Sequence, residues 1–352
     1  MSLQMKKMSL PIIRQMFQKV GIDFGSSRIR IVSDYDGQII DQAACIAVDT
    51  TNDQVIAVGN EAAAMSGRVD PRISIHWPVK DGVLYDPATA GALLKVLLRS
   101  IFRSTMLYGP VVMISVPGSS TDTQKESMPA LLYELGAREV YTIAQPLAAS
   151  IGAGVPIADA SGSFILHLGE GQVEAAVISL GSMVGCQSNL FAGGFLKQHI
   201  QLSLVNQRNL LVSQETAGQL LARVASAKAD YLAEKLVTGK DVASGKPKEL
   251  KITSADLSSA VQSMVSRAER TIQKLLSIIP AELTVDIIDK GLLLSGGMGG
   301  LHGLDSHLIQ TLGMPVAMVD TPGLAPIKGI ETALDNLDEF KDSLGYLGTS
   351  NI

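Results

Sequence analysis

A strand–turn–strand pattern that occurs twice constrains the fold of this chain more than any other sequence feature. In each copy, an apolar run leads into a tight turn containing glycine, and a second apolar run follows (residues 20–32 and 162–178). Glycines in such turns supply positive φ and let a ligand approach the backbone closely. Because the copies lie half a chain apart, we expect two related lobes, each offering a turn to a ligand held between them.

The two turns differ in charge, since the first contains Asp23 where the second contains His167. A third glycine turn follows an apolar strand at residues 296–300. Exposed backbone amides in such turns form anion-binding concavities, and a helix N-terminus after the third turn adds a favourable dipole. Neither a Walker A pattern nor a dinucleotide-binding fingerprint is present. The three turns predict an anionic ligand, and Asp23 suits Mg²⁺ bound through water.

Length and composition restrict the class of protein. A chain of 352 residues fits two lobes or two domains better than one small core. Its net charge of −5 gives no support to nucleic-acid binding as a main function. Cys45 and Cys186 match no metal-ligand spacing, which predicts reduced thiols in a cytosolic protein. No apolar run approaches the ~18 residues that span a bilayer, and no signal peptide is visible.

Residues 1–19 form a separate segment that is basic and contains no acid. Its apolar residues recur at helical spacing, and Pro11 suits a first helical position. A short basic amphipathic helix can lie in a membrane interface. A helix docked on the protein's own surface, or a disordered leading segment, is the alternative.

The remaining pattern predicts alternating strands and helices. We expect strands at 111–116, 140–143 and 292–294, and helices at 87–102, 119–135, 214–236 and 326–337. Gly193 and Gly194 are expected to form a turn, residues 238–251 a solvated hairpin or loop, and the last dozen residues a tail.

Several segments resemble one known family. These are residues 21–27 (GIDFGSS), 77–84 (WPVKDGVL), 174–181 (EAAVISLG) and 294–305 (LSGGMGGLHGLD). From residue 20 to residue 337, the chain is similar to the actin-like superfamily and, within it, to the MreB family of bacterial actins. The resemblance implies an α/β, actin-like (ribonuclease H-like) two-lobe fold with a duplicated β-sheet core and flanking helices.

The resemblance also implies domain limits, a ligand and partners. Lobe I would comprise residues 20–150 plus 325–345, with insertion IB near 34–80, and lobe II residues 151–324, with insertion IIB near 190–252. ATP or ADP with Mg²⁺ would be the ligand. The protein would form filaments with itself at the inner face of the cell membrane, in the cytoplasm, anchored through residues 1–19. Other actin-like paralogues and cell-wall synthesis proteins would be its partners.

Site residues can be transferred from the family by matching its motifs. Gln145 would position the attacking water, and Asp23 would hold the metal through water. The nucleotide would contact Asp23, Gly25, Ser26, Ser27, Arg28, Gly169, Gly171, Gln172, Gly296, Gly297 and Gly299.

The chain departs from the family pattern at this ligand. The second phosphate loop of the family reads D-I-G-G-G-T-T-E, whereas residues 167–174 read HLGEGQVE. His167 therefore replaces the Mg²⁺-associated acid, and Glu170 places a carboxylate where a glycine lies against phosphate. Gln145 replaces a glutamate, so it can orient water but cannot act as a base. Residues 218–223 lack the lysine and glutamate of the nucleoside-binding helix, and residues 193–196 lack the acid of a G-G-D turn.

These departures predict an MreB-like filament protein at the membrane with a degraded ATP site. Losing one transition-state group typically costs on the order of 10²–10³ in rate, so fast hydrolysis is not expected. The alternatives are an active filament-coupled ATPase, a sugar kinase or chaperone-type ATPase of the same superfamily, and a non-polymerising regulator of other filaments.

Overall fold

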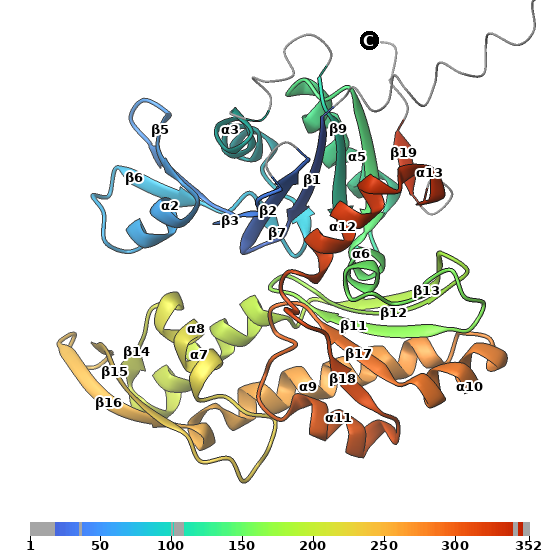
Figure 1. Cartoon of the computed structure of the whole chain (residues 1–352). Coiled ribbons are helices and arrows are strands. Elements are labelled where there is room, and N and C mark those ends of the chain that lie inside the picture. Colours follow the sequence, from blue (N-terminus) through green and yellow to red (C-terminus); the bar gives the residue numbers. More distant parts are fainter. Residues whose placement is uncertain (1–17, 35–36, 100, 102–108, 341–343, 348–352) are drawn as a thin grey trace, which may run out of the picture. The chain divides into compact units, whose positions relative to one another are not determined.

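The computed structural model describes residues 18–34, 37–99, 101, 109–340 and 344–347 (Figure 1). The predicted amphipathic helix therefore lies outside the described residues as far as residue 17. The chain forms two compact units, with residues 1–148 and 327–352 in unit 1 and residues 149–326 in unit 2.

Unit 1 is built on a six-stranded sheet in the order β19-β10-β9-β1-β2-β3. The strands are β1 (Lys19–Phe24), β2 (Arg28–Ser33), β3 (Ile40–Ala43), β9 (Val111–Val116), β10 (Glu139–Ala144) and β19 (Gly345–Leu347). Strand β1 is antiparallel to β2 but parallel to β9, and β9 is parallel to β10. The carboxyl ends of β1, β9 and β10 therefore meet at one edge of the sheet, where the first glycine turn begins.

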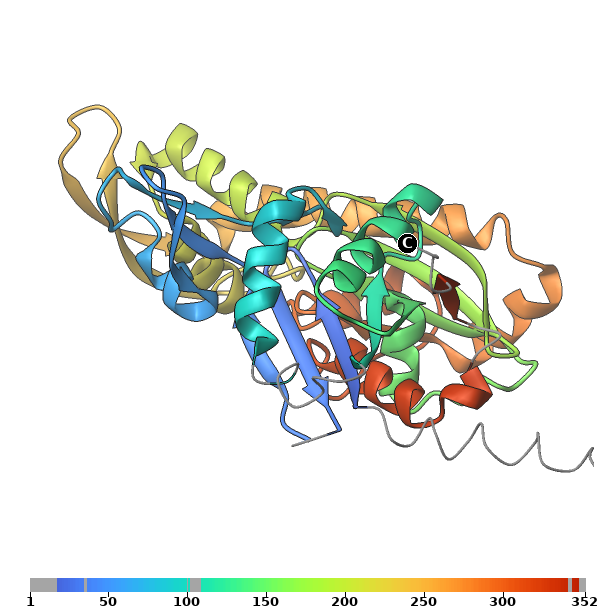
Figure 2. The same ribbon diagram turned by 90° about the horizontal axis from the view of Figure 1, so that it is seen from above.

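Helices cover both faces of this sheet (Figure 2). Helices α3 (Pro87–Leu97) and α5 (Asp122–Glu134) pack on the face that carries Val20, Ile22 and Phe24. Helix α12 (Ala325–Asp335) lies against Gly21 on the other face, and α13 (Leu337–Phe340) follows it. An added Cβ at Gly21 would lie 2.7 Å from Cγ2 of Ile330, so glycine permits this close approach.

A small three-stranded sheet of unit 1 contains β4 (Ile46–Asp49), β5 (Gln54–Val58) and β6 (Ile73–His76), with α2 (Gly59–Met65) against it. Strand β3, at the start of the segment expected as insertion IB, pairs instead with β2 of the main sheet. A hairpin of β7 (Val79–Lys80) and β8 (Val83–Leu84) follows. Cys45 is buried in this small core, and burial raises the pKa of its thiol to about 11, which keeps it protonated.

Unit 2 repeats the strand arrangement of unit 1. Its main sheet has the order β13-β12-β11-β17-β18, with β11 (Ser163–Leu168), β12 (Val173–Ser179), β13 (Ser182–Asn189), β17 (Leu292–Ser295) and β18 (Val316–Met318). As in unit 1, three antiparallel strands that follow one another in the chain join two further strands through a parallel pair. Both units thus share one five-strand order, which confirms the predicted duplicated α/β core.

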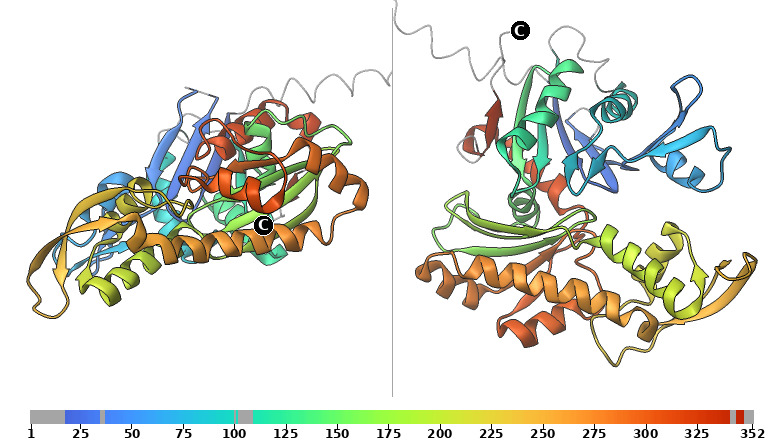
Figure 3. Two further views of the ribbon diagram at one scale, coloured as in Figure 1. Left: turned by 90° about the horizontal axis from the view of Figure 1, so that it is seen from below. Right: turned by 180° about the vertical axis from the view of Figure 1, so that it is seen from behind.

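Helices of unit 2 pack on its sheet (Figure 3). Helix α9 (Ser254–Leu276) contacts β12 and β13, α10 (Ala281–Lys290) contacts β11, and α11 (Leu304–Leu312) contacts β18. Residues of β11 and β12 are buried throughout, as expected for strands covered on both faces. No helix among the described residues is both long enough and apolar enough to cross a membrane.

Three sequence predictions in unit 2 and at the C-terminal end need correction. The helix predicted over 214–236 ends at Arg223 (α8, Gln214–Arg223), because the backbone of Ala227 donates to the carbonyl of His302 instead of continuing the helix. Gly193 and Gly194 open helix α7 (Gly193–Arg208) and are not an isolated turn. The expected C-terminal tail contains β19, which pairs with β10.

The hairpin predicted at 238–251 is confirmed. Strands β15 (Glu234–Asp241) and β16 (Pro247–Thr253) pair antiparallel, and β14 (Leu210–Leu211) completes a three-stranded sheet in unit 2.

Candidate functional site

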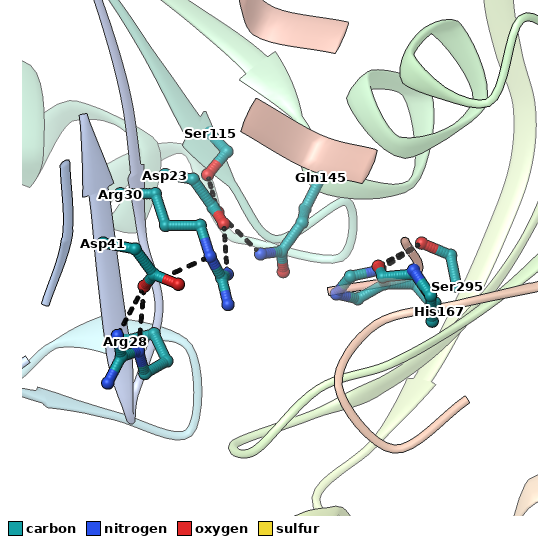
Figure 4. Close-up of polar contacts among 9 residues, drawn as sticks. Asp23, Arg28, Arg30, Asp41, Ser115, Gln145, His167 and Ser295 are labelled. Atoms are coloured by element: carbon teal, nitrogen blue, oxygen red, sulfur yellow. Dashed lines mark hydrogen bonds and ion pairs between the residues drawn. The ribbon is translucent and has the colours of Figure 1, made fainter. Parts of the chain in front are cut away.

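The first glycine turn centres on Asp23, whose side chain is almost fully enclosed at 3% exposure. Ser115 Oγ donates to its Oδ1 at 2.8 Å and Gln145 Nε2 donates to the same oxygen at 3.0 Å (Figure 4). Ser115 is near the end of β9, and Gln145 directly follows β10, so the parallel strands bring both residues to Asp23. The structure therefore places the predicted water-positioning residue in a hydrogen bond to the predicted metal-associated carboxylate.

A third donor to Asp23 comes from β2. Arg30 stands opposite Asp23 in the β1–β2 ladder, and its Nη1 lies 3.3 Å from Asp23 Oδ2. Its side chain is 15% exposed, so this ion pair is largely desolvated. A guanidinium next to a carboxylate forms a charge-assisted hydrogen bond, which is stronger than a neutral one. Asp23 thus has a protein cation and two protein hydrogen-bond donors as partners.

The row of charged side chains that begins with Asp23 and Arg30 continues across the sheet to β3. Arg30 Nε lies 3.4 Å from Asp41 Oδ1, and Nε of Arg28 donates to the same oxygen at 2.8 Å. Nη1 of Arg28 also donates to Asn60 Oδ1 at 2.9 Å. Arg28, expected to contact a nucleotide, is therefore engaged by groups of unit 1 itself (Figure 4).

The short turn between β1 and β2 is closed by its own hydrogen bonds. The amide of Gly25 donates to the carbonyl of Arg28 at 2.9 Å, and Ser26 Oγ accepts from the amide of Gly82 at 2.9 Å. The carbonyl of Ser27 accepts from Ala44 at 3.0 Å. The turn is consequently fixed to the β7–β8 hairpin and to the start of the small sheet.

The second turn, in unit 2, begins after His167, which is 4% exposed. Its Nδ1 lies 3.4 Å from Oγ of Ser295, the last residue of the parallel neighbour β17 (Figure 4). The amide of Gly169 donates to the carbonyl of Gln172 at 2.9 Å and closes the turn around Gly171. A buried imidazole that faces a serine hydroxyl replaces the carboxylate that a metal would require here.

Glu170 extends from this second turn to helix α7. Its Oε1 lies 2.6 Å from Nζ of Lys197, and both side chains are a little over one-fifth exposed. The amides of Gly193 and Gly194 donate to the carbonyls of Gly169 and Glu170 at 3.1 and 2.8 Å. The second turn and helix α7 are therefore joined by two backbone hydrogen bonds and one ion pair.

The third turn packs directly on the second. The amide of Met298 donates to the carbonyl of Leu168 at 3.0 Å, and the amide of Gly299 closes the turn onto Gly296 at 3.0 Å. Gly296 has φ +86°, which only glycine adopts readily, whereas an added Cβ at Gly297 would meet nothing within 4 Å. Unit 2 thus brings together all the ligand-turn glycines expected in it.

Three residues at these turns were missed by the sequence reasoning, namely Arg30, Ser115 and Lys197. Arg30 alternates with Ile29 and Ile31 in β2, and a charge inside such a strand is a signal that the sequence does contain. Ser115 interrupts the apolar run of β9 one position before its end. Lys197 was missed because Gly193 and Gly194 were predicted to form a turn, and no helix was predicted after them. The helical signal was present, since Leu196, Ile200 and Leu204 recur at four-residue spacing and are buried.

The position expected to face a metal is already paired with protein groups. Asp23 has three protein donors, one of them cationic, and the equivalent position of unit 2 is a histidine. Across the part of the chain that the structure describes, no cluster of three or more histidine, cysteine, aspartate or glutamate side chains could hold a metal ion. The second turn also presents the negative charge of Glu170, which opposes an approaching phosphate.

Two units with one repeated strand order, each with a glycine turn after its first strand, define an actin-like fold. MreB5 of Spiroplasma citri bound to AMPPNP superposes with a TM-score of 0.88 at 23% identity, over 93% of this chain and 98% of that one. The MamK double helical filament gives a TM-score of 0.73 at 17% identity, over 91% and 98% of the two chains.

Sequence comparison narrows the class to a family. The model of the MreB/Mbl protein family matches residues 17–342. The cell shape-determining protein Mbl of Bacillus subtilis is 30% identical over 322 residues, which cover 91% of this chain and 97% of that protein. The chain therefore belongs to the MreB/Mbl family, which confirms the resemblance seen in its motifs.

Proposed function

We propose that this chain is a cell-shape-determining filament protein of the MreB type that binds ATP weakly and hydrolyses it negligibly. Family membership supports the cytoskeletal role, and the relative from Bacillus subtilis carries that role in its name. The MamK structure, which has the same fold, is a double helical filament, and this supports self-assembly. The protein would act in the cytoplasm at the inner face of the membrane, with wall-synthesis proteins or related filament proteins as partners.

The enclosed carboxylate of Asp23 carries the proposal of an altered site. Its charge is balanced by Arg30, and its Oδ1 accepts from Ser115 and Gln145. A metal ion near Asp23 would be repelled by the guanidinium, and Oδ1 already accepts two hydrogen bonds from protein groups. Nε2 of Gln145 donates to Asp23, so of this amide only the carbonyl oxygen is left to orient an attacking water. Chemistry that depends on charge stabilisation in the transition state therefore lacks its main groups in unit 1.

Nucleotide titration tests the altered site. In calorimetry of the full chain with ATP and Mg²⁺, we expect no dissociation constant tighter than about 0.1 mM. Phosphate release should be at least about 10²-fold slower than that of an active filament ATPase. MreB5 of Spiroplasma citri, whose structure holds AMPPNP, is a positive control in the same buffer. Micromolar binding together with steady phosphate release would instead support the active ATPase.

Assembly and membrane binding are tested together. We expect filaments without nucleotide, visible by electron microscopy and recovered by pelleting, and co-sedimentation with anionic vesicles. Deleting residues 1–17 should abolish vesicle binding but leave pelleting. The deletion stops there because Lys19 starts β1 and its Nζ donates to the carbonyl of Leu334 at 2.8 Å.

A charge variant provides the control for this deletion. Replacing Lys6, Lys7 and Arg14 by glutamine keeps the length of the segment, and it should weaken binding to anionic vesicles more than to neutral ones. Unchanged vesicle binding after the deletion would contradict the anchor. Monomers under all conditions would favour the non-polymerising regulator.

A further inference from the structure

The N-terminus of helix α7 lacks an anionic group of its own. Its N-cap residue is Ala192, whose side chain makes no capping hydrogen bond, and its first turn contains no acid. The helix dipole gives such an end a partial positive charge, and Lys197 adds a full one. A helix end of this kind is stabilised by a nearby anion.

The anion at this helix end is the side chain of Glu170. Lys197 Nζ lies 2.6 Å from Glu170 Oε1. The second carboxylate oxygen occupies the space beside Gly193, where an added Cβ would lie 2.7 Å from it. An added Cβ at Gly194 would lie 3.3 Å from Oε1. The two glycines therefore leave room for the carboxylate directly at the first residues of the helix.

The aliphatic stem of Lys197 lies beside helix α8. Its Cδ lies 3.8 Å from the position that a Cβ would take at Gly218 of helix α8. A side chain at position 218 would therefore contact this stem. The stem of Lys197 thus passes Gly218, where helix α8 has no side chain.

We propose that Glu170 is an internal substitute for a bound phosphate, which neutralises the α7 N-terminus and Lys197 and keeps external anions out of the second turn. The inference rests on the proposed function and explains how unit 2 keeps its second turn joined to α7 without a nucleotide. A mobile phosphate is replaced by a carboxylate that is covalently part of the turn, so the contact requires no ligand. The carboxylate of Glu170 also repels any second anion that approaches the turn.

Chemical rescue of a Glu170 variant tests this inference. Tripolyphosphate, compared with NaCl at equal ionic strength, should leave the thermal unfolding midpoint of the wild-type chain unchanged. Glu170→Gln should lower the midpoint by about 2–4 °C. Millimolar tripolyphosphate should then restore that loss. In calorimetry, the variant should bind tripolyphosphate at least about tenfold more tightly than the wild type.

Two further variants separate a vacated anion site from a general charge effect. Glu234→Gln removes an equally charged partner from an exposed ion pair with Lys251 and should gain no tripolyphosphate affinity. Glu170→Gln combined with Lys197→Met should lose the midpoint rescue. If Glu170→Gln folds poorly, Glu170→Asp keeps the charge but shortens the side chain and should show part of the gain.

Two results would overturn the inference. One is a wild-type midpoint that rises with tripolyphosphate as much as that of the variant, and the other is a variant with no gain in affinity. Either result concerns anion binding at unit 2 alone. The proposed function would fail differently, through tight binding of ATP and Mg²⁺ to the wild-type chain.

Discussion

Replacing Arg30 by methionine is expected to lower the free energy of unfolding of unit 1 by about 3–5 kcal/mol. Asp23 would keep its hydrogen bonds from Ser115 and Gln145, but its side chain, 3% exposed, would lose its cation. An uncompensated buried charge is costly, whereas Asp41 on the neighbouring strand would still have Arg28 as a partner. Urea unfolding followed by tryptophan fluorescence measures the effect, since Trp77 is the single tryptophan of the chain and lies in unit 1.

Two controls identify the buried charge as the cause. Asp23→Asn combined with Arg30→Met removes both charges and should recover most of the loss, because no unpaired ion remains inside the sheet. Arg72→Met removes an arginine from an exposed pair with Asp70 and should change stability by less than about 0.5 kcal/mol. The single Arg30 variant matching the wild type, or the double variant being no more stable than the single one, would count against the argument.

Gly296→Ala is expected to destabilise unit 2 by about 2–4 kcal/mol. The residue has φ +86°, and an added Cβ would overlap the carbonyl of Leu168, whose oxygen accepts from Met298. The third turn would have to move away from the second turn, and this would break the hydrogen bond between them. Thermal unfolding monitored by circular dichroism reports the loss.

Gly297→Ala is the matched control, one residue further along the same turn. An added Cβ there meets nothing within 4 Å, and the residue is exposed. Its stability should stay within about 0.5 kcal/mol of the wild type. Equal losses for the two alanine variants would show that the turn tolerates displacement and that its packing on the second turn is not what requires glycine.

Arg30 and Glu170 have the same kind of role in the two units, because each supplies a protein charge at one of the glycine turns. In unit 1 a protein cation pairs with the carboxylate expected to face a metal, and in unit 2 a protein anion pairs with the lysine and helix end that would attract a phosphate. Each pair lies within its own unit. In the altered site that we propose, each of these two turns would therefore carry its own counter-charge.

Much of the fold could be predicted from the sequence because burial leaves a periodic pattern. The strands β9, β11 and β12 follow from largely continuous apolar runs, and the hairpin of β15 and β16 follows from the turn residues between them. The helix predicted over 214–236 was wrong because its apolar spacing continues past Arg223, while the backbone there bonds to His302. Periodicity reports which side of a segment is buried, and it does not report which distant backbone group competes for its hydrogen bonds.

The sequence by itself determined the family, the duplicated strand–turn–strand units and the departures from the family's ligand motifs. Only the tertiary structure decided which charged side chains meet at the turns. Arg30 faces Asp23 because β1 and β2 pair in one particular register, and Glu170 reaches Lys197 because the second turn lies at the start of α7. Such charge pairs depend on which strand neighbours and helix ends meet in space. The linear sequence does not show these contacts, because they exist only once the strands have paired and the helices have packed.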